Sequence, residues 1–167
     1  MGIEVNGIAH IQLTVNDAER CVPFWEELCH FFGMKTLIRG DEIVYCIGSR
    51  TGILVRGAPP GKQGAAFDQD TAGLHHLCFR AREREDIDEV RGFVSRQGAA
   101  RIVREPEDGS FAPGYYSVLF EDPDGIRVEV NYVPGKGHFG EKGRLAEGGE
   151  GVASQYDEAG LHGGNHA

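Results

Sequence analysis

Apolar and polar residues alternate along several short stretches of the chain, and a turn signal ends each stretch. Residues 8–15 alternate in this way, which is typical of a half-buried strand. Residues 16–19 resemble a helix capping box, and apolar residues then continue at helical spacing to Gly33, a typical helix end. Three strand-like pieces follow, at about 34–39, 42–48 and 52–57. The first part of the chain therefore predicts a βαβββ unit.

The same order of elements is predicted a second time. A strand is expected at 74–81 and a helix at about 83–97, which ends at Gly98. Further strands are expected at about 100–104, 115–121 and 126–132. Such internal repetition constrains topology more than any local pattern. We therefore expect an α+β fold with a first module at 1–57, a linker at 58–73, a second module at 74–134 and a Gly-rich C-terminal tail at 135–167.

Side-chain alternation on these strands selects three candidate metal ligands. Successive residues of a strand face opposite sides, so the apolar face should cover the helices and the polar face should line a cavity. His10, His76 and Glu129 fall on the polar face of the first, fifth and last strands, and alternation favours His76 over His75. A single strand histidine is more often structural, but three ligand-type residues at matched positions are harder to explain by chance. Two imidazoles and a carboxylate suit Mn, Fe, Co, Ni or Zn.

Composition narrows the class of protein. The 167 residues are 40% hydrophobic and 26% charged, which is ordinary for a soluble globular domain. The net charge of −9 disfavours nucleic acid and anionic membranes as partners, and no apolar run is long enough to span a bilayer. No secretory signal is visible, and the four cysteines lack metal or C-x-x-C spacing. We therefore expect buried, reduced thiols in a cytoplasmic protein.

Four stretches carry a resemblance to a known family. The most specific are residues 73–79 and residues 120–125 followed by Glu129, and they are accompanied by 8–17 and 23–33. Over about 6–134 the chain resembles the vicinal oxygen chelate superfamily, also called the glyoxalase / bleomycin-resistance / extradiol-dioxygenase superfamily. The resemblance implies two βαβββ modules that form a cupped mixed sheet with helices on the outer face. It also implies metal ligands at His10, His76 and Glu129.

The chain departs from two branches of that superfamily. Glyoxalase I relatives carry a fourth, acidic ligand where Leu54 or Val55 stands here, and extradiol relatives carry a Tyr where Leu119 stands. The implied reaction class therefore stays open between isomerase or lyase, dioxygenase and thiol addition. Glu129 is also a candidate proton acceptor, as chemistry in the family allows. Candidate substrate-binding residues are Gln12, Tyr45, Arg80, Tyr115 and Arg127.

Two main functions follow as hypotheses. The first is a metal-dependent enzyme that binds a small oxygenated substrate directly to the ion. The alternative is a non-catalytic small-molecule binding or resistance protein of the bleomycin-resistance type; a weaker third is a regulatory module. Two-module relatives commonly dimerise and some exchange modules, so His10 is expected to join His76 and Glu129 either of its own chain or of a partner in a homodimer.

Overall fold

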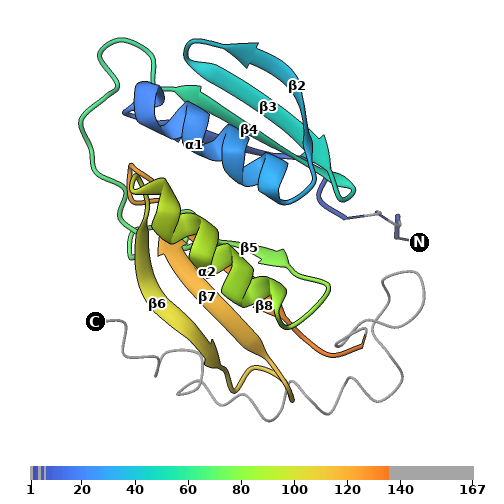
Figure 1. The fold of residues 1–167 in the computed structure, drawn as a ribbon. Coiled ribbons are helices and arrows are strands. Elements are labelled where there is room, and N and C mark those ends of the chain that lie inside the picture. Colours follow the sequence, from blue (N-terminus) through green and yellow to red (C-terminus); the bar gives the residue numbers. More distant parts are fainter. Residues whose placement is uncertain (1, 4, 6, 136–167) are drawn as a thin grey trace.

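The computed structural model describes residues 2, 3, 5 and 7–135 and contains two βαβββ modules (Figure 1). The first module consists of β1 (Ile11–Val15), α1 (Ala18–Phe31), β2 (Lys35–Gly40), β3 (Ile43–Gly48) and β4 (Thr51–Gly57). The second consists of β5 (Leu77–Arg80), α2 (Asp86–Gln97), β6 (Arg101–Asp108), β7 (Tyr116–Glu121) and β8 (Arg127–Tyr132). The predicted α+β class and both modules are confirmed. The expected tail lies outside the described residues except for Gly135.

Each module has its own four-stranded mixed sheet. The strand orders are β1-β4-β3-β2 and β5-β8-β7-β6, with β1 parallel to β4 and β5 parallel to β8. The remaining neighbours are antiparallel. As a result, β1 and β5 occupy equivalent edges of the two sheets.

Strands β1 and β5 begin later than the sequence pattern predicts. Pairing with the parallel partner starts at Ile11, opposite Ile53, and at Leu77, opposite Val128. His10 therefore lies immediately before its strand, as His76 does. Helix α2 also begins later than predicted, because the Asp86 carboxylate accepts the backbone N–H groups of residues 82 and 83 and keeps that segment in a turn.

The helix ends follow from local chemistry that is visible in the sequence. The Asp17 side chain accepts the backbone N–H of Arg20 at 3.1 Å, which satisfies one free donor of the first turn of α1. Helix α2 ends at Gly98, whose φ of 64° lies in the left-handed region that favours glycine. Both helices cover the apolar faces of their sheets, as their buried residues show.

The two modules are joined through their helices and through the turn between β7 and β8. The Trp25 indole N–H donates to the buried Asp122 carboxylate at 2.8 Å. Phe31 of α1 stacks on Phe93 of α2 with ring centroids 4.4 Å apart, and the two helices are neighbours near the middle of the molecule (Figure 1). A single core cluster consequently extends across both modules.

All four cysteines are free thiols, as expected. Cys21, Cys29 and Cys46 are buried, but the prediction that every thiol is buried is wrong for Cys78. Cys78 is exposed because it lies on the polar face of the edge strand β5. Neither α1 nor α2, the helices of the described residues, is long and apolar enough to cross a membrane.

Candidate metal centre

Glu129 lies at the centre of a polar cluster on the face of the second sheet that points away from α2. Its strand, β8, is flanked by β5 and β7, and the residue is buried, with 6% of its surface exposed. The carboxylate Oε2 lies 3.2 Å from Nε2 of His76. The other oxygen, Oε1, accepts hydrogen bonds from the Tyr115 hydroxyl at 2.7 Å and from Arg104 Nη2 at 3.1 Å. One oxygen is thus fixed by two donors while the other faces the imidazole.

The carboxylate of Glu129 is ionised at neutral pH. Burial alone raises the pKa of a carboxyl group, because it penalises the charged form. Here hydrogen bonds from His76, Tyr115 and Ser117 outweigh burial and lower the pKa of Glu129 to about 2. The group therefore carries the negative charge that a cation ligand needs.

The separation of His76 and Glu129 fits two ligands of one metal ion. Two ligand atoms at bond lengths of about 2.0–2.1 Å and angles of about 90–109° lie about 2.9–3.4 Å apart. The observed distance of 3.2 Å between Nε2 and Oε2 falls in that range. The other ring nitrogen of His76, Nδ1, lies 2.7 Å from Nδ1 of His75, a contact that fixes the ring orientation. The geometry thus brings His76, and not His75, to the carboxylate.

Tyr115 is positioned by a close approach to a glycine. A Cβ atom at Gly109 would lie only 2.7 Å from Tyr115 Cδ1, so the ring occupies space that a side chain would fill. Asn131 Nδ2 donates to the tyrosine hydroxyl at 3.3 Å. Burial raises the pKa of Tyr115 well above its usual value, with a further contribution from Glu129. The hydroxyl stays protonated and can therefore donate to Glu129.

Arg104 is a site residue that the sequence pattern did not indicate. The register of β6 against β7 shifts between Ile102 and Arg104. Regular pairing would place residue 103 opposite Leu119, but Arg104 takes that position. This bulge turns the guanidinium to the face that carries Glu129, where Nη2 also donates to Ser117 Oγ at 3.0 Å. Regular alternation would have turned Arg104 toward the helix, and no residue of β6 marks the bulge.

The first module carries a histidine and a tyrosine in a similar arrangement, apart from the Glu129 cluster. His10 is exposed, and its ring meets the Tyr45 ring edge to face with centroids 6.5 Å apart. A Cβ atom at Gly52 would lie 2.6 Å from Tyr45 Cε2, so this tyrosine also covers a glycine. Gln12 is exposed on the same face of β1 as His10, two residues further on. Each module therefore contains a histidine and, near it, a tyrosine whose ring packs closely against a glycine.

The two predicted substrate-binding arginines have structural partners. Arg80 Nη2 donates to the backbone oxygens of Val133 at 3.0 Å and of Gly135 at 3.2 Å. Arg127 is buried, and its Nε lies 3.4 Å from the carboxylate of Glu121. Both side chains therefore have partners in or next to the second module.

The structure separates His10 from the other two predicted ligands. Within residues 2, 3, 5 and 7–135 of one chain, no three His, Cys, Asp or Glu side chains gather in an arrangement that could hold a metal ion. One chain therefore brings two candidate ligands, His76 and Glu129, to one place and carries the third on its other module.

Known proteins share both the sequence pattern and the fold. Residues 7–130 match the Glyoxalase/Bleomycin resistance protein/Dioxygenase superfamily, and the chain belongs to this family. The uncharacterized protein YqjT of Bacillus subtilis is 26% identical over 121 residues, which cover 72% of this chain and 94% of that protein. The resemblance drawn from the sequence motifs is confirmed.

Solved structures agree with this assignment. A candidate glyoxalase from Bacillus halodurans has a TM-score of 0.67 at 25% identity, over 75% of this chain and 95% of its own. The lactoylglutathione lyase of Agrobacterium tumefaciens has a TM-score of 0.56 at 22% identity, over 77% of this chain and 95% of its own. The lyase therefore shares the fold with this chain.

Proposed function

We propose that this protein is a divalent-metal-dependent enzyme that acts on a small oxygenated substrate bound at the metal. The observation that carries the proposal is the pair formed by His76 and the ionised Glu129, whose ligand atoms are 3.2 Å apart. This separation suits Mn, Fe, Co, Ni or Zn with positions left for substrate. The proposed reaction is of the isomerase, lyase or dioxygenase type, and free thiols are consistent with a cytoplasmic location.

We further propose that the third ligand is His10 of a second copy of the chain. Within one chain, the two modules contact each other through their helices. Strands β1 and β5 remain at the edges of their sheets, where backbone N–H and C=O groups can pair with another strand. His10 and His76 each lie immediately before one of these edge strands. Edge-to-edge pairing of β1 from one copy with β5 from the other would bring the two histidines together, and two-fold symmetry would form the site twice.

The surrounding side chains support this chemistry. A bound divalent ion would supply Lewis acidity toward a substrate oxygen. Tyr115 and Arg104 fix Oε1 of Glu129 and so direct Oε2 toward His76. Glu129 is also positioned to accept a proton from substrate. Gln12 and Tyr45 would contribute the substrate contacts from the opposing module.

Metal binding tests the proposal directly. The purified protein, stripped with chelator and then reconstituted with Zn²⁺, should bind about one equivalent per chain with high affinity. His76→Ala and Glu129→Gln should each lose this binding, because each removes a ligand atom. His30→Ala removes an imidazole on α1 that contacts Thr36, and it should retain the full equivalent. A wild-type protein that takes up less than about a tenth of an equivalent under these conditions excludes the metal-dependent function.

A further inference from the structure

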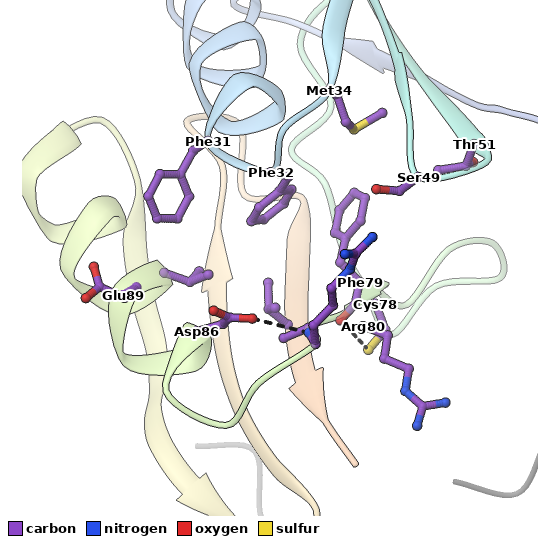
Figure 2. A pocket seen from close by; sticks show the side chains of 14 residues that line it. Phe31, Phe32, Met34, Ser49, Thr51, Cys78, Phe79, Arg80, Asp86 and Glu89 are labelled. Carbon is purple, nitrogen blue, oxygen red and sulfur yellow. Dashed lines mark hydrogen bonds between the residues drawn. The ribbon is translucent and has the colours of Figure 1, made fainter. Parts of the chain in front are cut away.

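A cavity lies at the junction of the two modules, on the side of the second sheet that faces the helices (Figure 2). Its volume is about 470 Å³. Two segments of the first module, the end of α1 and the β3–β4 hairpin, meet three of the second around it, in β5 and the turn that follows it, α2 and β8. Small-molecule sites in proteins commonly have volumes of about 300–1,000 Å³, so the cavity is large enough for a ligand.

Aromatic rings form the walls of this cavity. Figure 2 shows Phe32 at the end of α1 beside Phe79 of β5, with Phe31 further out toward α2. The rings of Phe32 and Phe79 have centroids 5.0 Å apart and planes tilted by 49°. Phe31 keeps 39% of its surface exposed although it borders the cavity. Water that occupies this hollow contacts apolar surface, and an apolar ligand that displaces it gains about 25 cal/mol for each Å² buried.

The charged groups at the rim balance one another. Two arginines, Arg80 and Arg82, and two acidic residues, Asp86 and Glu89, are among the residues that line the cavity. The Asp86 carboxylate already accepts the backbone N–H groups of Arg82 at 3.2 Å and Glu83 at 3.0 Å. Two positive and two negative side chains give this lining no net charge that would select a charged ligand. The rim therefore favours a neutral molecule.

The cavity is separate from the candidate metal centre. Phe79 of β5 pairs with Val130 of β8, and both side chains point toward the helices. The neighbouring pair, Cys78 and Glu129, points to the opposite face of the sheet. The sheet therefore lies between the aromatic walls and the carboxylate, and the two sites adjoin at the edge strand β5, where Cys78 and Arg80 also border the cavity.

The geometry points to a second small-molecule site in this cavity, for a neutral aromatic ligand of about two fused rings. The volume, the three phenylalanine walls and the balanced rim define this class of ligand. The site forms within one chain, so it does not depend on the proposed metal or on the proposed dimer.

Methionine NMR gives a local readout of this site. The chain contains two methionines, and Met34 lines the cavity. In full-length protein labelled with [methyl-¹³C]methionine, 2-naphthol should shift the Met34 signal and leave the Met1 signal in place. The shift should saturate with a Kd of about 1 mM or below, as expected for a small apolar ligand. A Met34 signal that does not move up to the solubility limit of 2-naphthol overturns the proposal.

Two phenylalanines with similar exposure provide a matched pair of variants. Phe31→Ala removes one wall and should weaken 2-naphthol binding at least about fivefold. Phe111→Ala removes a ring of similar exposure, 41% against 39%, that does not line the cavity, and it should leave the affinity within about twofold. Glu129→Gln should also leave it unchanged, which separates this site from the metal centre. Equal losses in Phe31→Ala and Phe111→Ala, or loss in Glu129→Gln, would contradict the assignment.

Discussion

At the scale of single residues, the main feature of the candidate centre is that the two oxygens of Glu129 have different partners. Oε1 accepts from Tyr115 and Arg104, while Oε2 is left to face His76. Partners that orient a metal ligand in this way commonly change metal affinity by about 10–100-fold when they are removed. Tyr115 and Arg104 are therefore positioning residues for the carboxylate.

Substitution of Tyr115 tests this positioning role. Tyr115→Phe removes the hydroxyl that donates to Oε1 and should weaken Zn²⁺ binding by about 10-fold or more, because the carboxylate loses one of the donors that orient it. Competition with a chromophoric chelator measures this affinity. The matched control is Tyr116→Phe, whose hydroxyl donates to Asp88 of α2 at 3.0 Å. Equal Zn²⁺ affinities for the two variants would contradict the role of Tyr115.

The sequence indicated part of this cluster and missed part of it. Alternation selected Glu129, which lies within β8, and it favoured His76 over His75, although His76 lies one residue before β5. Arg104 was missed because a bulge in β6 reverses its side, and a bulge leaves no reliable mark in the local pattern. The different partners of the two Glu129 oxygens also depend on contacts with residues of other strands and loops, and the local alternation of one strand does not specify such contacts.

At the scale of elements, a carboxylate on α1 connects the helix to the sheet it covers. Glu26 accepts hydrogen bonds from the Thr36 hydroxyl and from Arg39 Nε, both at 2.8 Å. The bond from Thr36 is the main cause of a lowered pKa of Glu26, and Arg39 adds to it against the opposing effect of burial. These contacts fix the end of α1 that leads to the aromatic walls of the cavity.

The lowered pKa predicts how this contact depends on pH. Its contribution to folding is fully present above the usual glutamate pKa of 4.5 and is lost as pH falls through the lowered folded-state value. Glu26→Gln should therefore be less stable than wild type by about 1 kcal/mol at pH 7, and the difference should shrink on acidification below about pH 4.5. Urea unfolding at several pH values measures it. Glu27→Gln, at an exposed position of the same helix, should show no comparable change.

At the scale of the whole molecule, the modules pack through their helices while their candidate half-sites lie apart. The stack of Phe31 on Phe93 and the bond from Trp25 to Asp122 determine this arrangement. The repeat and its two modules were predictable, because each module repeats the same local periods. The arrangement of the modules was not predictable, since it depends on contacts between residues far apart in the sequence, 97 positions in the case of Trp25 and Asp122.

Mixed dimers test whether the site forms between copies. In a dimer of one His10→Ala chain and one His76→Ala chain, one site has lost both histidines and the other retains all three ligands. Random mixing makes half of the dimers mixed, so about one quarter of the sites should be intact. Co-refolding the two variants at equal concentration and counting high-affinity Zn²⁺ sites measures this fraction. A site formed within one chain would instead yield none, as in each variant refolded alone.

The turn between β7 and β8 has a consequence for the origin of the repeat. Asp124 of this turn accepts the backbone N–H groups of Asn16 and Asp17, where α1 begins in the other module. A carboxylate from one half therefore completes the helix start of the other. If the chain arose by duplication of an ancestral βαβββ gene, its halves have since specialised and are no longer interchangeable.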